Sequence, residues 1–278
     1  MKDESTGDAQ GAPDQGGQNE AMWRGLLLGT DRRYARARGW LKHVPSEPRC
    51  KMCAAPFAGI GQPLMRLLHR DPWAKNPLYC TLCFNVLDAH RGGAEIEASF
   101  LFADVRGSTT MAEGLSPTDF RRQLNRFYEV ATRILVEHDA IVDKFVGDEV
   151  IGLFIPALAK DAHAQRAIQA AQALLRATGH DDPGGPWLPV GAGVHTGVAF
   201  VGSVGQPPVT DLTALGDVVN TTARLASAAG PGEVLVTDAA RTAAQFDTAG
   251  LERRELELKG KTETTSVFVV RIHAGAPA

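Results

Sequence analysis

The amino-acid sequence predicts an α/β (α+β) protein in which a small N-terminal four-cysteine module precedes a ferredoxin-like sheet of βααββαβ order. Two observations lead to this fold class. From Gly93 to Ile272, β-rich apolar runs alternate with segments whose apolar residues recur at steps of three and four. All four cysteines precede this region, in Cys50-Lys-Met-Cys53 and Cys80-Thr-Leu-Cys83, so the chain changes character near residues 91–96.

Composition divides the chain into four segments. Residues 1–20 are polar, rich in Gly, Gln and Asp, and have no apolar period, so we expect a disordered tail. We expect residues 21–92 to form a basic helical and four-cysteine module, and residues 93–273 to form the α/β domain. A short C-terminal tail, residues 274–278, follows.

Local signals justify the elements of the α/β domain in turn. Ser116-Pro117 is typical of a helix start, and apolar residues at helical spacing then continue to His138. Val146-Gly147-Asp148-Glu149 is typical of a tight hairpin, and we expect another hairpin within Leu188–Val204. Further helices are expected at 162–178 and 218–229. The remaining expected strands are 97–105, 140–145, 150–155, 233–237, 254–258 and 265–271.

Charge and hydropathy exclude several function classes. The 29 basic and 32 acidic residues give a net charge of −3, which disfavours non-specific nucleic-acid binding. No apolar run approaches the roughly 18 residues of a membrane span. Residues 1–20 lack the layout of a secretory signal, so a cytoplasmic location is expected. The segment Met22–Met52 is basic, however, and is either a solvated face or a docking surface for an acidic regulatory partner or a membrane.

Two aspartates follow apolar strands. Asp104 ends Ser99-Phe-Leu-Phe-Ala-Asp104, and Asp148 lies in the hairpin between two other strands. If these strands are neighbours in one sheet, the two carboxylates converge, and such hard oxygen ligands suit Mg²⁺ or Mn²⁺. The alternative is a turn residue and a strand-end cap, each with a purely structural role.

The surroundings of these aspartates resemble the catalytic domain of the class III nucleotidyl cyclases over about residues 95–273. Five motifs occur in the family's order. They are Phe102-Ala-Asp104-Val-Arg-Gly-Ser-Thr109, Lys144-Phe-Val-Gly-Asp148-Glu, Gly191-Ala-Gly-Val-His-Thr-Gly197, Thr213-Ala-Leu-Gly-Asp-Val-Val-Asn220-Thr-Thr-Ala-Arg224 and Leu258-Lys-Gly-Lys261. In this family the ribose 3′-hydroxyl attacks the α-phosphate of a nucleoside triphosphate and expels pyrophosphate.

The resemblance implies roles for the matching residues. Asp104 and Asp148, with the backbone carbonyl of Val105, correspond to the ligands of two Mg²⁺ or Mn²⁺ ions per active site. Asn220 corresponds to the residue that orients the ribose. Arg224, four residues later on the same helical face, corresponds to the residue that stabilises charge on the α-phosphate.

Base selection rests on two further matches. Lys144 and Thr213 correspond to the purine-contacting pair. An ammonium group only donates, so Lys144 suits adenine N1 and leaves guanine N1–H unsatisfied. The Thr213 hydroxyl can accept from adenine N6 but can also donate, so ATP is favoured mainly through Lys144. Lys259 corresponds to the lysine that holds the terminal phosphates.

The family divides each active site between two subunits, so a chain with every element implies a two-fold homodimer that binds ATP. We therefore expect an adenylyl cyclase. The alternatives are a guanylyl cyclase and a catalytically silent, cyclase-like regulatory scaffold. A nucleic-acid-binding zinc module is disfavoured because the basic segment has few aromatics for stacking.

The two Cys-x₂-Cys pairs predict a metal site. Cys50, Cys53, Cys80 and Cys83 can supply the four thiolates of a structural zinc ribbon. A small module gains folding free energy from such a metal because its own core is small. An iron–sulfur cluster, reversible disulfides or simple reduced core cysteines are the alternatives.

Overall fold

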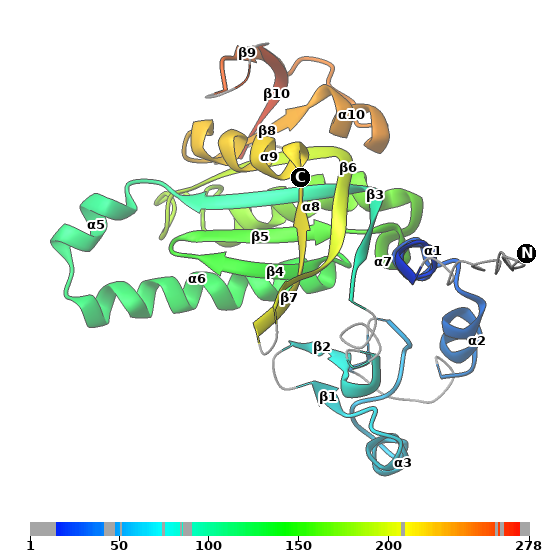
Figure 1. The fold of residues 1–278 in the computed structure, drawn as a ribbon. Helices are drawn as coiled ribbons and strands as arrows, with labels where there is room; N and C mark the ends of the chain where they lie inside the picture. The colour runs from blue at the N-terminus through cyan, green and yellow to red at the C-terminus, as the bar shows by residue number, and fades with distance from the viewer. Residues whose placement is uncertain are drawn as a thin grey trace, which may run out of the picture.

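The computed structural model describes residues 15–41, 48–50, 52–73, 76–83, 85, 91–206, 209–258, 261 and 264–272. Within them lies an eight-stranded sheet of order β4-β5-β3-β6-β8-β10-β9, with β7 paired to β6 (Figure 1). Its strands are β3 (Gly93–Val105), β4 (Ile141–Val146), β5 (Glu149–Phe154), β6 (Val190–Gln206), β7 (Val209–Leu215), β8 (Glu233–Thr237), β9 (Glu252–Leu256) and β10 (Thr265–Arg271). Neighbouring strands are antiparallel except β6 and β8, which are parallel.

Helices connect and cover these strands. They are α1 (Gln15–Leu27), α2 (Arg32–Leu41), α5 (Ser108–Gly114), α6 (Pro117–Glu137), α7 (Pro156–Ala159), α8 (His163–Ala177), α9 (Asp217–Ala228) and α10 (Asp238–Ala244). The order β3-α5-α6-β4-β5-α8-β6 is the predicted βααββαβ arrangement, so the predicted fold class is confirmed. The described part of the chain contains no helix with the length and apolarity that crossing a membrane requires.

Strand β3 is buried on both faces, and its side chains alternate between two hydrophobic cores. Leu101, Ala103 and Val105 contact the core that α6 and α8 cover. Phe100 and Phe102 contact the opposite core, to which α1 and α9 contribute. A strand buried on both sides is expected to be a near-continuous apolar run, as this one is. Asp104 is the last residue but one of this interior strand.

Helix α6 begins as the sequence predicts. Ser116 is the N-cap, its hydroxyl oxygen accepts a hydrogen bond from the Asp119 backbone N–H at 3.1 Å, and Pro117 follows. The apolar face of the helix buries Phe127, Ala131 and Ile134 under the sheet. Figure 1 shows α6 running beside β4, which brings the helix close to the β4–β5 hairpin.

Two sequence expectations are wrong in detail. The hairpin expected within Leu188–Val204 does not form, because β6 continues unbroken from Val190 to Gln206. It does so because β3 pairs with residues 190–202 of β6 and β7 pairs with residues 200–206. Residues 15–20, expected to be part of the disordered tail, instead belong to α1, and residues 1–14 lie outside the described residues. Trp23 of this helix is fully buried in the sheet's core, which orders the segment.

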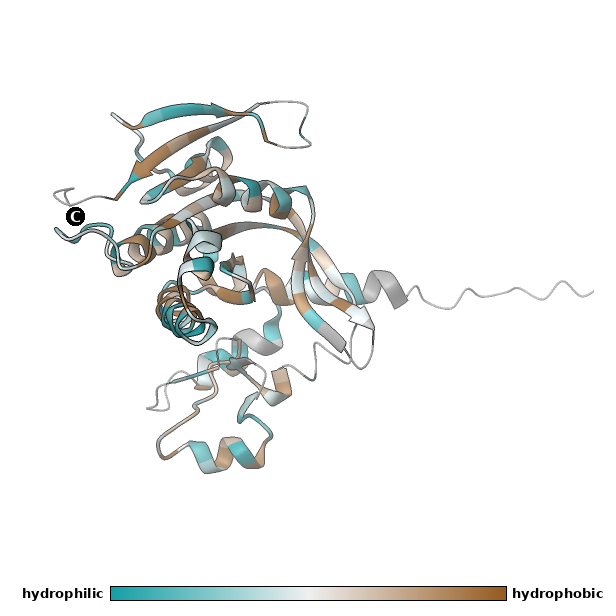
Figure 2. Cartoon of the chain, turned by 90° about the vertical axis from the view of Figure 1, so that its left-hand side faces the viewer, coloured by the Kyte–Doolittle hydropathy of each residue, from teal (hydrophilic) through white to brown (hydrophobic). Residues whose placement is uncertain are grey.

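The four-cysteine module comprises α3 (Gln62–Leu67), β1 (Pro72–Trp73) and β2 (Asn76–Cys80), and it lies at the bottom of Figure 1. Its cysteines form a small core of their own with Phe57 and Met65. Tyr79, next to Cys80, instead packs into the sheet's core. At the far edge of the sheet, β9 is mainly hydrophilic (Figure 2), as an exposed edge strand should be.

Candidate active site and four-cysteine cluster

The carboxylates of Asp104 and Asp148 meet at one end of the sheet. Asp104 is the last residue but one of β3 and stands opposite Glu149 in the register with β5. The Val105 backbone N–H donates to the Asp148 carbonyl oxygen at 3.3 Å, which ties the hairpin to the end of β3. Burial raises the pKa of Asp104, and the nearby Asp148 carboxylate raises it further. The two carboxylates, 44 positions apart in the chain, therefore lie near each other at this end of the sheet.

The β4–β5 hairpin presents Asp148 from a two-residue loop. Val146 pairs with Glu149, and Gly147 takes the left-handed φ of +62° that such a turn requires. The Tyr128 hydroxyl of α6 donates to the Gly147 carbonyl oxygen, and its ring lies 4.5 Å from that of Phe145. Sequence analysis missed Tyr128, because within a helix it resembles any other residue of the apolar period.

Two more charged groups belong to this site. Arg106 donates to the Asp104 carboxylate, and its Nη1 also donates to the Ser227 carbonyl oxygen at 2.9 Å. The pKa of Glu149 is raised to about 7, first by burial and then by the charges of Asp104 and Asp148. Sequence analysis assigned no role to Arg106 although it lies in the first motif, because a contact with residue 227 has no local signal.

The donor chemistry of this site fits divalent cations. It offers ionisable oxygens on adjacent strands, and their mutual repulsion, evident in the raised pKa values of Asp104 and Glu149, would be relieved by a cation. In the described part of the chain, only the cysteines place three or more His, Cys, Asp or Glu ligand atoms within 4.8 Å of one another. A cation at the aspartates would therefore take its other ligands from groups such as backbone carbonyls, water or phosphate oxygens, as Mg²⁺ commonly does.

Lys144 and Thr213 meet on a single carboxylate. The Thr213 hydroxyl donates to Asp143 Oδ2 at 2.9 Å, and Lys144 Nζ lies 3.8 Å from the same oxygen. Thr213 is only 4% exposed, whereas the Lys144 side chain is 44% exposed. Burial raises the pKa of Asp143, and the Lys144 ammonium and the Thr213 hydroxyl counteract that effect. The family resemblance predicted that Lys144 and Thr213 act as a pair, but it did not point to Asp143, which contacts both.

Helix α9 carries Asn220 and Arg224 at four-residue spacing. Asn220 is exposed and Arg224 is half-buried, while Val218 and Leu225 on the opposite face are buried. The helix lies close to β6 because Gly193 has no side chain: a Cβ there would come within 2.6 Å of Leu225 Cβ. Among the described residues, no hydrogen bond or ion pair joins Asn220 or Arg224 directly to Asp104 or Asp148; the link between α9 and Asp104 is Arg106.

The predicted phosphate lysine, Lys259, lies outside the described residues. Its neighbour Lys261 forms an ion pair with Asp217 at the first residue of α9. This pairing lowers the pKa of Asp217. Lys261, the last residue of this motif, is therefore attached to the helix that carries Asn220 and Arg224.

Comparison with known proteins decides the family. The family described as adenylate and guanylate cyclase catalytic domain matches residues 94–271, which include every motif noted above. The chain belongs to this cyclase family. Among solved structures, the guanylyl cyclase Cya2 superposes with a TM-score of 0.58 at 26% identity, covering 67% of this chain and 96% of Cya2. The adenylyl cyclase CyaB from P. aeruginosa gives a TM-score of 0.54 at 26% identity, covering 63% and 94%.

Curated relatives of this chain include adenylate cyclases. Adenylate cyclase 1 of Rhizobium meliloti is 33% identical over 134 residues, 46% of this chain and 20% of the relative. The adenylate cyclase of Anabaena cylindrica is 29% identical over 187 residues, 62% of this chain and 36% of the relative. The chain thus spans from a fifth to about a third of the length of these relatives.

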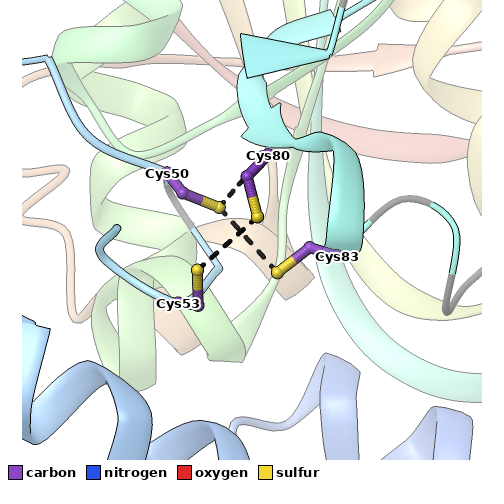
Figure 3. Close-up of side chains that lie close together, drawn as sticks. All are labelled: Cys50, Cys53, Cys80 and Cys83. Carbon is purple, nitrogen blue, oxygen red and sulfur yellow. Dashed lines mark hydrogen bonds between the residues drawn. The ribbon is translucent and has the colours of Figure 1, made fainter. Parts of the chain in front are cut away.

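Outside the catalytic domain of this cyclase, the four cysteines gather in one buried cluster (Figure 3). All four Sγ atoms lie within 4.8 Å of one another, and no disulfide joins these cysteines. The separations Cys50–Cys83 and Cys53–Cys80 are 4.0 and 3.7 Å. A tetrahedral zinc site with metal–sulfur bonds of about 2.3 Å has sulfur–sulfur edges of about 3.8 Å. The cluster therefore has the dimensions of a four-thiolate metal site.

Hydrogen-bond donors surround these sulfurs. The Arg70 guanidinium donates to Cys53 Sγ at 3.1 Å, and the Cys80 backbone N–H donates to Cys50 Sγ at 3.2 Å. The Arg70 guanidinium places a positive charge beside the cluster, which favours the thiolate that a metal requires. The nearby cysteines in turn raise the pKa of Arg70, which keeps its positive charge in place.

Proposed function

We propose that this chain is an adenylyl cyclase that converts ATP into 3′,5′-cyclic AMP and pyrophosphate. The observation that carries the proposal is the convergence of Asp104 and Asp148 at the end of the sheet, in a chain of the cyclase family. Two carboxylates at this position suit the chemistry of phosphoryl transfer, in which divalent cations neutralise the charge of the triphosphate.

Asp104, Asp148 and the backbone carbonyl of Val105 would hold two Mg²⁺ or Mn²⁺ ions. When bound, these ions lower the pKa of the ribose 3′-hydroxyl and neutralise the triphosphate. Arg106 occupies the Asp104 carboxylate in the structure, and a cation would compete with it for the same oxygens. Glu149, behind the pair, adds to the negative potential that favours the cation.

Three other residues of the proposed site would bind and orient the nucleotide. Asn220 would hold the ribose so that the 3′-oxygen is aligned with the α-phosphate. Arg224, one helical turn away, would stabilise the charge that develops on that phosphate; loss of such a donor typically costs about 10²–10³ in rate. We assign the terminal phosphates to Lys259 on the strength of its motif alone.

A homodimer explains why these groups do not meet within one chain. Asn220 is exposed on α9, and the hairpin that carries Asp148 exposes the apolar side chains of Phe145 and Val146. Exposed apolar residues next to a polar site favour an interface rather than solvent. We infer a two-fold dimer in which the aspartates of one subunit face Asn220 and Arg224 of its partner, with two equivalent sites.

ATP is the proposed substrate because Lys144 can only donate. Its ammonium satisfies adenine N1, an acceptor, and conflicts with the N1–H of guanine. The two curated relatives described above are adenylate cyclases, but the two solved structures are an adenylyl and a guanylyl cyclase. The proposed base preference therefore rests on Lys144 and Thr213.

The proposal is tested by incubating the purified chain with Mn²⁺ or Mg²⁺ and either ATP or GTP, and quantifying the cyclic products. We expect cyclic AMP to exceed cyclic GMP. Replacing Lys144 with Glu should shift the preference toward GTP, because a carboxylate accepts from guanine N1–H. Predominant cyclic GMP from the unmodified chain would indicate a guanylyl cyclase, and no cyclic product with either nucleotide would indicate a silent scaffold.

For the four-cysteine cluster we propose a structural Zn²⁺ ion. Its support is the buried arrangement of four unpaired thiols at tetrahedral spacing. Elemental analysis of purified protein should find about one zinc per chain. Cys83→Ser should lower both the zinc content and the melting temperature, whereas iron with sulfide, or Cys83 in a disulfide, would contradict the assignment.

A further inference from the structure

Asp143 has no assigned role in the reaction, yet it is the residue on which the two purine-contacting side chains meet. Its carboxylate lies on β4 between Lys144 and Thr213 of β7, strands that do not pair with each other. The Asp143 side chain is only 7% exposed. It is therefore a buried acid held between two polar neighbours, not a solvated surface charge.

A β-bulge places the carboxylate there. Along β4, Val142 pairs with Gly152 and Lys144 with Ile151, which are consecutive residues of β5, so Asp143 is the extra residue of the pair. A bulge interrupts the strict alternation of side chains and redirects the inserted one. As a result, adjacent residues Asp143 and Lys144 bring their charged groups to 3.8 Å instead of pointing to opposite faces.

The hydrogen bond from Thr213 has a chemical consequence. A hydroxyl group has one proton and two acceptor sites. Because Thr213 donates its proton to Asp143 Oδ2 at 2.9 Å, only lone pairs remain for a third group. The 6-amino group of adenine can donate to those lone pairs, whereas the O6 of guanine, an acceptor, would face them unsatisfied.

We propose that Asp143 is a specificity-determining positioning residue that commits Thr213 to accept, and so makes the Lys144–Thr213 pair select adenine over guanine. Without Asp143, the Thr213 hydroxyl could accept from adenine or donate to guanine. With its proton donated to Asp143, Thr213 can only accept from the base, so both Lys144 and Thr213 disfavour guanine. The inference rests on the proposed cyclase function and adds to it a second source of base discrimination.

The test is the ratio of kcat/KM for ATP to that for GTP in four proteins: wild type, Asp143→Ala, Thr213→Val and the double variant. In Asp143→Ala the Thr213 proton becomes free to donate to guanine O6. We expect the ATP:GTP ratio to fall about 10-fold, the effect of one hydrogen bond. In the Thr213→Val background, Asp143→Ala should change the ratio less than about twofold, because the group on which it acts is absent.

Asp211→Asn is the matched control. Asp211 is an exposed neighbour whose charge raises the pKa of Asp143, and no described hydrogen bond joins it to Thr213. Its ATP:GTP ratio should equal that of the wild type. Thermal melting verifies that each variant is folded. Where a variant turns over too slowly, calorimetric affinities for 3′-deoxy-ATP and 3′-deoxy-GTP, which lack the nucleophile, provide the same ratio.

The outcomes separate the two proposals. A wild type that prefers ATP, with a ratio that Asp143→Ala leaves unchanged, overturns the inference and leaves the adenylyl cyclase function intact. An equal fall in both backgrounds also overturns it, since Asp143 then acts without Thr213. A wild type that prefers GTP overturns the proposed function and the inference together.

Discussion

Arg106 donates a hydrogen bond to the carboxylate of Asp104, near the end of β3. The same guanidinium also donates to the carbonyl of Ser227 in α9, so it joins Asp104 to the helix that carries Asn220 and Arg224. Without a cation, this arginine partly offsets the repulsion between Asp104 and Asp148, as its lowering effect on the pKa of Asp104 indicates.

Asp104→Asn should abolish the response of the protein to divalent cations. An amide has the same shape but no charge, so we expect loss of at least about 10³ in kcat with Mn²⁺ and ATP. The rise in melting temperature that Mn²⁺ confers on the wild type should also disappear. Glu129→Gln, an exposed change on α6, is the control and should retain both properties. An unchanged cation response in Asp104→Asn would remove the proposed metal role.

Mixing two inactive variants should restore activity if the sites are shared between subunits. Asp104→Asn damages the metal half of each site, and Arg224→Ala damages the phosphate half. After mixing and subunit exchange, half of the dimers are heterodimers with one intact site of two, so activity should recover to about a quarter of wild type. Cyclic AMP formation measured against each variant alone checks this. Recovery near zero, with subunit exchange verified, would place the complete site within one chain.

Gly193→Ala should displace α9 from the sheet. The added Cβ would come within 2.6 Å of Leu225 Cβ, so we expect a loss of about 1–3 kcal/mol in the free energy of unfolding. Because the helix carries Asn220 and Arg224, kcat should fall as well. Gly184→Ala is the matched control, since its Cβ would meet nothing within 4 Å. Urea unfolding and kcat on both variants test this, and equal behaviour of the two would contradict it.

Glu233 should make the stability of the domain sensitive to acid. It accepts hydrogen bonds from Arg254 at 3.0 and 3.1 Å and from Arg271 at 3.0 Å, joining β8 to β9 and β10. The pKa of Glu233 is lowered to about 2, first by the Arg254 hydrogen bonds. A depressed carboxyl pKa stabilises the folded state above the ordinary value near 4.5, and this contribution is lost as pH falls toward 2.

Glu233→Gln should therefore lower the free energy of unfolding by about 2 kcal/mol at pH 7, because the substitution removes the charged hydrogen bonds to Arg254 and Arg271. The difference from wild type should shrink below about pH 4.5 and vanish near pH 2, because the wild-type carboxyl is then protonated too. Urea unfolding at several pH values measures this difference. A gap that stays constant from pH 7 to pH 3 would show that Glu233 does not titrate in this way.

Much of this cyclase follows from its sequence alone. Apolar periods, the Ser116-Pro117 start and the Gly147-Asp148 hairpin are local signals, and they predicted the βααββαβ order and the elements of the site. The motifs around Asp104 and Asp148 predicted a site with two distant carboxylates, and these two residues lie near each other in the structure. The order of elements is predictable because backbone preferences and short motifs depend on neighbouring residues.

Tertiary structure decided the contacts between groups that no local pattern relates. The bulge that turns Asp143 toward Thr213, the reach of Arg106 to Ser227 and the continuity of β6 each depend on which strand or helix lies alongside. Helix α1, which the composition assigned to a separate N-terminal module, packs on the sheet because Trp23 is buried in its core. Composition and period determine which faces are apolar, but strand register and close helix contact determine which polar groups finally share a hydrogen bond.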